Sequence, residues 1–168
     1  MKVTHIITGL NRGGAEAVLV RLVTYDTANT HEIIVFKDKG AYGDKLDASG
    51  ISLFLLGMTR TISIKAFVSL YRYLRITKPD VVQTWMFHAD LVGGTVAKIA
   101  GAKKVFWGVR AANIDLLPFA TKIVVRCCSI ISYFVPNKII CNGVKGKKIM
   151  SSNFYCNRKL SVIQNGYD

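Results

Sequence analysis

The chain has 168 residues, of which 51% are hydrophobic and 20% are charged, and its formal net charge is +13. This length and apolar content predict one globular domain with a substantial core, and they exclude an intrinsically disordered chain. The excess of Lys and Arg favours anionic partners, namely nucleic acid, acidic lipid head groups or phosphorylated ligands, without choosing among them.

Apolar runs alternate with helix-like patterns along the whole chain. In the first half we expect a strand at 3–8, a helix at 15–27, a strand at 31–36, a short helix or turn at 41–50, a strand at 51–56 and an amphipathic helix at 63–78. In the second half we expect strands at 81–85, 103–109 and 137–142, helices at 89–101, 115–134 and 144–152, and a strand-like run within 159–168. Continuously apolar strands that alternate with helices indicate a parallel sheet covered on both faces. The sequence therefore predicts a doubly wound α/β fold over residues 1–168.

The longest apolar stretch, residues 114–135, is too interrupted to span a membrane. Lys122 and Arg126 interrupt it and Pro118 breaks its beginning, so its uninterrupted apolar length is well below the ~20 residues that a spanning helix requires. We expect a helix that is buried or that lies in an interface.

The cysteines indicate a reducing compartment. Their positions, Cys127, Cys128, Cys141 and Cys156, give no C-x-x-C spacing, which favours buried thiols over a metal site or a disulfide. No signal-peptide pattern opens the sequence. We expect a cytoplasmic protein that binds no metal.

Ligands of open parallel sheets bind beyond the carboxyl ends of the strands, so the loops after the strands are the first place to look for a site. In "THIITGLNRGGAEA" the adjacent Gly13 and Gly14 precede a predicted helix. Amide groups at a helix N-terminus that no side chain shields can bind an anion such as a diphosphate, and Asn11 and Arg12 add a donor and a charge. The alternative is a tight turn in which the glycines provide positive φ.

The loop after the fourth strand, in "QTWMFHADLVGG", contains His88 immediately before a predicted helix. The positive helix end disfavours an imidazolium ion, so His88 should stay neutral and exchange hydrogen bonds with a hydroxyl. A structural role is the alternative for His88, and it is the preferred interpretation for His5 and His31. Trp85 and Phe87 could stack on a sugar or base of an acceptor, with core packing as the alternative.

Two further groups of polar residues are candidates for contacts. Arg110 and Asn113 follow the fifth strand and could bind an anion or a hydroxyl. Lys65, Arg72 and Arg75 flank the amphipathic helix at 63–78, where they form either a solvated face or a surface for anionic lipid.

Several motifs are absent from the sequence. There is no G-x-x-x-x-G-K-[ST], no H-E-x-x-H and no G-x-G-x-x-G followed by an acidic residue about twenty positions later. The last absence argues against a dinucleotide-dependent dehydrogenase. Glu16 and Glu32 are the only glutamates, so the sequence provides no paired-glutamate motif.

The segments "HIITGLNRGGAE", "PDVVQTWMFHADLVGG", "VFWGVR" and "VIQNGYD" together resemble the N-terminal domain of glycosyltransferase family 4. These are retaining enzymes with two Rossmann-like domains, the GT-B fold, and many act in lipopolysaccharide or other polysaccharide biosynthesis. The resemblance implies a nucleotide-sugar co-substrate, a glycan or lipid-linked acceptor, and no cofactor. It implies that Gly13 and Gly14 approach the donor diphosphate, that His88 lies by the transferred sugar, and that Arg110 lines the cleft.

The resemblance also implies a second domain. In the family, the Asn-Gly pair that corresponds to Asn165-Gly166 marks the start of a C-terminal domain that carries an Arg/Lys pair and a paired-glutamate motif. Neither feature is present here, so we expect this chain to be the acceptor-side half, with the donor-binding domain absent and with little or no activity alone. We expect a cytoplasmic location, with the inner face of the cytoplasmic membrane as the alternative.

Two other functions fit parts of the sequence. A non-catalytic basic α/β module could dock on anionic membrane or a partner protein. A nucleic-acid-binding domain rests on charge alone, because no recognition-helix signature or aromatic-studded basic strand accompanies it.

Overall fold

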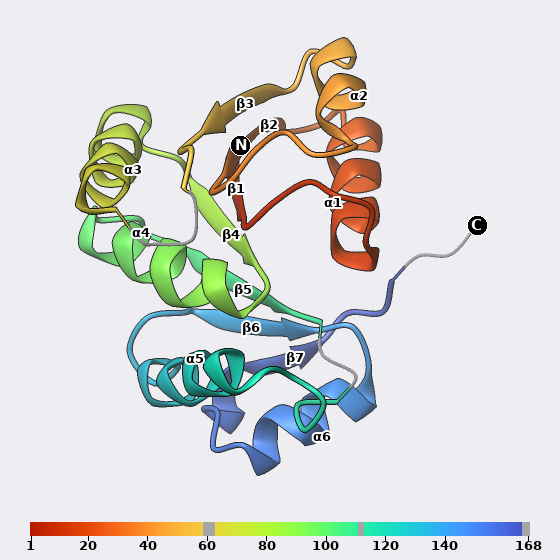
Figure 1. Ribbon diagram of the computed structural model, residues 1–168, viewed down its shortest axis with the longest axis vertical. Helices are drawn as coiled ribbons and strands as arrows, with labels where there is room; N and C mark the ends of the chain where they lie inside the picture. Colours follow the sequence, from red (N-terminus) through yellow and green to blue (C-terminus); the bar gives the residue numbers. More distant parts are fainter. Residues whose placement is uncertain (59–62, 111–112, 166–168) are drawn as a thin grey trace.

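The computed structural model describes residues 1–58, 63–110 and 113–165, and within them seven strands form one parallel sheet flanked by helices (Figure 1). The first elements are β1 (Lys2–Ile7), α1 (Gly14–Tyr25), β2 (Thr30–Val35), α2 (Gly43–Ala48), β3 (Ser52–Leu55), α3 (Ile64–Thr77) and β4 (Val81–Trp85). The π-helical turn η1 (Ala89–Gly94), α4 (Thr95–Ile99), β5 (Val105–Val109), α5 (Phe119–Ile131), β6 (Lys138–Cys141), α6 (Val144–Ser152), the 3-10 turn η2 (Asn157–Lys159) and β7 (Leu160–Val162) follow. The predicted α/β architecture is confirmed.

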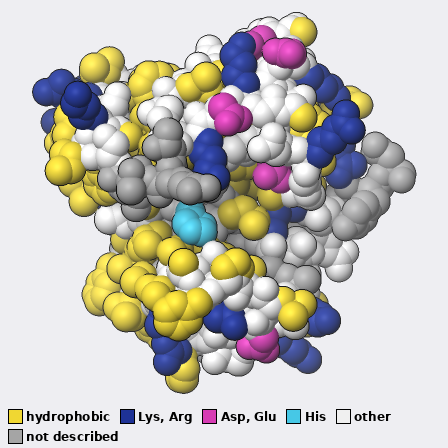
Figure 2. Space-filling view, viewed as in Figure 1, with side chains coloured by type: hydrophobic (Ala, Val, Ile, Leu, Met, Phe, Trp, Pro, Cys, Tyr) yellow, Lys and Arg dark blue, Asp and Glu magenta, His cyan; other side chains and the backbone are white. Residues whose placement is uncertain are grey.

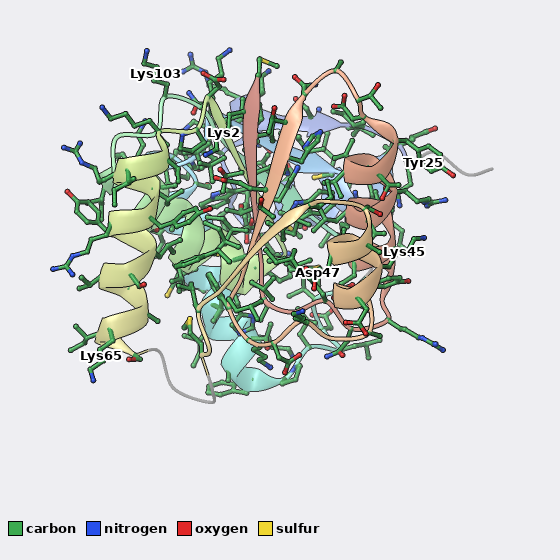
Figure 3. All side chains as sticks on the ribbon, turned by 90° about the horizontal axis from the view of Figure 1, so that it is seen from above. Lys2, Tyr25, Lys45, Asp47, Lys65 and Lys103 are labelled. Carbon is green, nitrogen blue, oxygen red and sulfur yellow. The ribbon has the colours of Figure 1, made fainter. Side chains whose placement is uncertain are left out.

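The strand order places a reversal in the middle of the sheet. The order is β3-β2-β1-β4-β5-β6-β7, with all neighbours parallel, so successive strands move one way from β1 to β3 and the other way from β4 to β7. Because crossovers between parallel strands are right-handed, helices from the two halves cover opposite faces. Figures 1 and 3 show α1 and α2 on one side of the sheet and α3 on the other.

Each face of the sheet has its own apolar core. On the face covered by α1 and α2, Leu19 and Leu46 pack with Ile7 and Ile33. On the other face, α3 to α6 bury a larger set against the strands: Leu70, Leu74, Val96, Val125, Cys128 and Met150. Both faces of the strands are therefore covered by apolar side chains, as their continuous hydrophobicity predicted.

The predicted helix at 89–101 is instead two segments, η1 and α4. A Cβ atom at Gly93 would lie 2.7 Å from Ile6 Cγ2, and one at Gly94 would overlap Trp107 Nε1. The two glycines therefore let this helical segment lie very close to the sheet. Wide π turns are rare and are often found at functional sites.

Proline determines two helix ends that differ slightly from the prediction. Helix α5 begins at Phe119 rather than at 115, because Pro118 is its N-cap and the residue before a proline disfavours helical geometry. Helix α3 ends at Thr77, where Lys78 takes a left-handed conformation with φ 43° before Pro79. None of the helices in the described ranges is long and apolar enough to cross a membrane.

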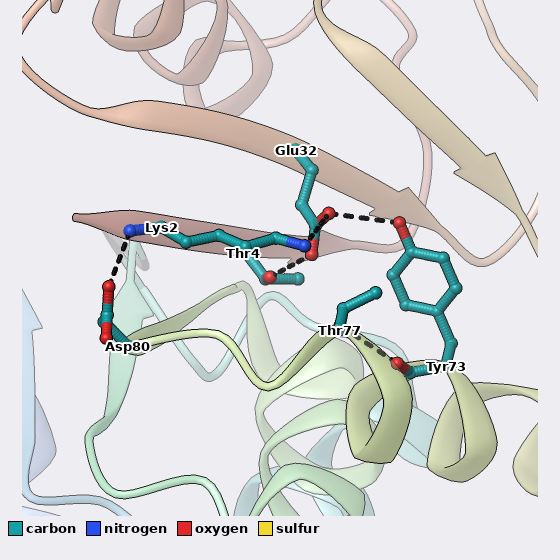
Figure 4. A network of polar contacts seen from close by, with 6 residues as sticks. All are labelled: Lys2, Thr4, Glu32, Tyr73, Thr77 and Asp80. Carbon is teal, nitrogen blue, oxygen red and sulfur yellow. Dashed lines mark hydrogen bonds and ion pairs between the residues drawn. The ribbon is translucent and has the colours of Figure 1, made fainter.

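A buried ionic network fastens the amino-terminal ends of the central strands (Figure 4). Glu32 accepts hydrogen bonds from Thr4 and from the Tyr73 hydroxyl (3.1 Å), and its Oε2 lies 3.0 Å from Lys2 Nζ. Burial, and then the negative charge of Glu32, raise the pKa of Tyr73 to about 12. Glu32 is thus a structural anion at the sheet edge opposite the one where a ligand is expected.

His5 and His31 belong to a second buried chain of hydrogen bonds. Trp85 Nε1 donates to His5 Nδ1 (3.2 Å), His5 Nε2 lies 3.0 Å from His31 Nδ1, and His31 Nε2 lies 3.2 Å from Asp26 Oδ2. Burial is the main reason that the pKa of His5 falls to about 3, so this ring is neutral and donates through Nε2. The structural interpretation of both histidines agrees with this geometry.

Candidate functional site

The strand order reverses between the neighbouring strands β1 and β4, and in open parallel sheets the ligand crevice lies at such a reversal, between the loops that follow the two strands. The loop after β1 contains Gly13 and Gly14, and the loop after β4 contains His88. Lys37 lies two residues after the end of β2, and its amide donates to Thr8 O at 3.1 Å. The fold therefore brings the predicted glycine turn and the predicted histidine to two sides of one crevice.

The glycine turn does not need glycine for its backbone conformation. Gly13 is the N-cap of α1 with φ −163° and ψ 166°, which is extended backbone, and no positive φ occurs at either glycine. The tight-turn alternative is therefore wrong. A Cβ at Gly14 would meet nothing within 4 Å, so a side chain there would only obstruct something approaching from outside this domain.

The N-terminus of α1 is occupied in part by the carboxylate of Glu16. No described side chain caps the helix, and Asn11 and Arg12 are exposed in the loop before it. The Glu16 carboxylate bends back onto Gly13, where a Cβ atom would overlap it, and it lies in the first turn, where a negative charge is stabilised by the helix dipole. An incoming anion would meet the same amides that this carboxylate now faces.

A neighbouring loop braces the glycine turn. Tyr42 N donates to Leu10 O at 3.0 Å, and Gly40 has φ +54° with no space for a Cβ against the Leu10 backbone. Gly40 is thus required both by its left-handed conformation and by the close approach of the two loops. Gly40 was not among the predicted site residues, although an isolated Gly after a strand is a turn signal.

His88 is exposed at the start of η1. Partial burial, and then the positive charge of Lys37, lower its pKa. The predicted neutral imidazole agrees with this direction, and desolvation followed by the Lys37 charge is its cause. A neutral ring keeps one donor and one acceptor nitrogen for a hydroxyl group.

Met86, two residues before His88, has an unusual backbone. Its φ is 72°, a left-handed conformation that costs free energy for a residue with a side chain. Two hydrogen bonds hold it, from Met86 N to Gly108 O (3.1 Å) and from Asp90 N to Met86 O (2.9 Å). Backbone strain of this kind is concentrated at functional sites. No feature of the sequence predicted the positive φ of Met86.

Three neighbours of His88 point inward. Trp85 and Phe87 are each 3% exposed, so the structure shows the core-packing alternative for both and leaves no ring face for an acceptor on this domain. Asp90 is not a helix cap: it is fully buried and accepts a hydrogen bond from Thr84 Oγ1 at 2.5 Å. Burial raises the pKa of Asp90 to about 8, so it is largely protonated at neutral pH.

Arg110 and Asn113 lie after β5 but differ in their contacts. The Arg110 guanidinium stacks on the Trp85 ring at 4.9 Å and donates to Asn165 Oδ1, which links the ends of β4, β5 and β7. Asn113 is exposed, and its Oδ1 accepts the Asp115 amide at 2.9 Å in a local turn. Gly166, the other half of the predicted Asn-Gly pair, lies outside the described residues.

The remaining predicted residues lie outside the crevice. Lys65, Arg72 and Arg75 are exposed on α3, and Figure 3 shows Lys65 at the end of that helix, pointing away from the sheet. The four cysteines are free, and three of them are buried. Across residues 1–58, 63–110 and 113–165, no cluster of three His, Cys, Asp or Glu side chains could hold a metal ion.

Solved structures share this fold. HepE of Anabaena, solved in complex with UDP, superimposes with a TM-score of 0.83 at 16% identity over 100% of this chain and 45% of that chain. A UDP-GlcNAc 2-epimerase from Methanocaldococcus jannaschii matches with a TM-score of 0.68 at 15% identity over 98% of this chain and 46% of that one. The fold is that of a GT-B domain.

A sequence relative is known as well. The chain is 28% identical over 141 residues to an Escherichia coli UDP-Gal:α-D-GlcNAc-diphosphoundecaprenol α-1,3-galactosyltransferase. This similarity covers 80% of the chain but only 36% of that enzyme. No protein-family model matches the sequence.

Proposed function

We propose that this chain is the acceptor-side domain of a nucleotide-sugar-dependent glycosyltransferase that transfers a sugar to a cell-surface glycan or a lipid-linked acceptor. The observation that carries the proposal is the 28% identity to a galactosyltransferase over 80% of the chain. The fold alone is shared with an epimerase, so sequence similarity is what favours transfer over epimerisation. The same relative suggests a UDP-sugar donor and an acceptor sugar on a lipid diphosphate.

In this proposal the amides at the N-terminus of α1 receive the donor diphosphate. Gly14 leaves the approach open, whereas the Glu16 carboxylate has to move away from Gly13, and Lys37 and Arg110 add positive charge at the same sheet edge. Fixed dipoles and charges of this kind stabilise the negative charge that develops on a departing diphosphate. No metal ion is needed for that role.

His88 is proposed to hydrogen-bond a hydroxyl of the transferred sugar or of the acceptor through its neutral ring. The buried Glu32 carboxylate contacts Thr4, Lys2 and Tyr73. The buried Asp90 carboxyl group accepts a hydrogen bond from Thr84. Neither group is therefore placed to act as a nucleophile. This arrangement fits a retaining transfer without a protein nucleophile. In such a transfer the acceptor attacks from the face that the diphosphate leaves, and the departing diphosphate takes the acceptor proton. The sugar and nucleotide of the donor would be held mainly by a second domain.

A non-catalytic module is the competing function. A non-catalytic module would not explain why the glycine turn, the strained Met86 and the exposed neutral His88 occur together.

If the acceptor of the proposed glycosyltransferase is lipid-linked, the enzyme acts at the cytoplasmic face of a membrane.

The test is sugar transfer by the enzyme that contains this chain, measured with radiolabelled UDP-galactose and a diphosphoundecaprenol-linked GlcNAc acceptor. His88→Ala is expected to lower kcat by about 100-fold, because a hydrogen bond to the reacting sugar is lost. His88→Gln, which keeps a neutral donor and acceptor, should retain part of the activity. Both variants should unfold at the wild-type temperature, since His88 is exposed. Wild-type turnover in His88→Ala would remove His88 from the site.

Gly14→Ala separates ligand approach from folding. The new methyl group meets nothing in this domain, so the free energy of unfolding should stay within about 0.5 kcal/mol of wild type. The KM for the nucleotide sugar should rise at least about tenfold, because the methyl group obstructs the diphosphate. An unchanged KM would show that the donor does not approach this turn.

A further inference from the structure

Helix α5 presents large apolar side chains to the solvent. Phe119, Ile123 and Ile130 are 79%, 50% and 64% exposed, and Phe134 just beyond the helix is 76% exposed. Spacings of four, seven and four residues place these side chains along one side of a helix. The opposite side of α5 is buried in the core through Val125, Cys128 and Ser129.

Further apolar side chains extend this side of α5. Leu116 is 83% exposed in the turn before the helix, Tyr133 is 53% exposed after it, and Phe154 is 64% exposed in the loop after α6. Figure 2 shows hydrophobic side chains gathered over α5, with Lys and Arg at the edge of the patch. Surface helices normally turn polar side chains outward, and a continuous apolar patch marks a binding surface. We call this set of residues the α5 surface.

The charge around the α5 surface is positive. Lys122 and Arg126 are exposed on α5, and the Arg126 guanidinium lies 5.3 Å from the centre of the Phe154 ring. Residues 91–165 contain twelve Lys and Arg and a single acidic residue, Asp115. Aromatic and aliphatic side chains beside basic ones match an anionic lipid surface, where apolar groups enter the interface and cations meet head groups.

From this combination we propose that the α5 surface docks the protein on an anionic bilayer. Helix α5 has 13 residues, so it lies in the plane of the interface rather than across it. A second copy of the chain is a poorer partner, because two copies that each carry a charge of +13 repel one another. The proposal goes beyond sugar transfer and holds whatever reaction the protein catalyses.

The α5 surface differs from the basic face of α3. Lys65, Arg72 and Arg75 give α3 the charge for attraction to lipid, but its strongly exposed apolar side chains are Ile64 (83%) and Ile76 (80%), at its two ends. Val68 and Tyr71 lie between them but are only 41% and 37% exposed, so α3 offers less apolar surface to a bilayer than α5 does. The same double substitution on α3 is therefore a matched control for one on α5.

The experiment is flotation of the purified protein with vesicles, without any catalytic readout. Wild type should float with phosphatidylcholine vesicles that contain phosphatidylglycerol, and not with phosphatidylcholine alone. F119S/I123S should lower the partition coefficient at least about tenfold, whereas I64S/I76S should float like wild type. Circular dichroism and thermal unfolding should be unchanged in both variants, because all four side chains are exposed.

Three outcomes would overturn the proposal. One is equal flotation of wild type and F119S/I123S. Another is binding that does not depend on phosphatidylglycerol. The third is that wild type forms a dimer, that the F119S/I123S variant is monomeric, and that neither protein floats with the vesicles. This result would assign the α5 surface to contact with a second copy of the chain.

Discussion

Gly94→Ala is expected to lower the free energy of unfolding by about 2–3 kcal/mol, as overpacking of a tight interior does. The new Cβ would overlap Nε1 of Trp107, a side chain with no exposed surface in the middle of β5. Trp107 is enclosed by the core of the α3 to α6 face and cannot move aside, so η1 must lift from the sheet. Alanine is the better helix former, but this gain of about 1 kcal/mol does not offset the overlap.

Thermal unfolding measures this effect directly. For a protein of this size, the melting temperature should fall by about 5–10 °C. Gly14→Ala is the matched control, because it adds the same methyl group at a helical glycine with open space around it. Equal melting temperatures for the two variants would show that η1 does not pack on Trp107 as closely as described.

Asp90→Asn is expected to stabilise the protein at pH 8 by several kcal/mol and to have little effect near pH 4. Burial raises the pKa of Asp90 from 3.8 to about 8, so between these values the folded state holds a proton that the unfolded state releases. The free energy of unfolding therefore declines as pH rises through this window, by ~1.4 kcal/mol for each pH unit. Asparagine stays neutral, and this decline disappears.

Urea denaturation at a series of pH values tests the Asp90 prediction. The difference between wild type and Asp90→Asn should grow from pH 4 to pH 8, with the variant more stable at the upper end. Asp115→Asn makes the same substitution at an exposed position and should run parallel to wild type. Parallel curves for Asp90→Asn as well would mean that this carboxyl is not desolvated in the folded protein.

Asp90 also shows how the interior beneath the candidate site is arranged. Burial is the main cause that raises the pKa of Cys141 to about 11. Cys128 donates to Phe87 O at 3.4 Å. A protonated Asp90 keeps this layer of β4, η1 and α5 free of charge, directly below the segment that presents His88.

The sequence alone was sufficient for the architecture and for the edge of the sheet where a site is expected. Continuous apolar runs between helix-like patterns specify a parallel sheet, because only burial on both faces tolerates them. The first, second and fourth strands were each predicted within one residue of β1, β2 and β4. The rule that ligands bind beyond carboxyl ends then pointed to the glycine turn and His88, since strand direction follows from the fold class.

The orientation of individual side chains depended on the tertiary structure. Trp85, Phe87 and Asp90 surround His88 in the sequence, yet they point into the core while His88 remains exposed. The positive φ of Met86 and the stacking of Arg110 on Trp85 arise from contacts between β4 and β5. The outward apolar side of α5 also became apparent only in the tertiary structure. A helical pattern shows that apolar residues share one side of a helix, but not whether that side packs on the core. Local sequence determines periodicity through neighbours a few residues apart, whereas burial depends on segments that are distant in the chain and meet only in the folded domain.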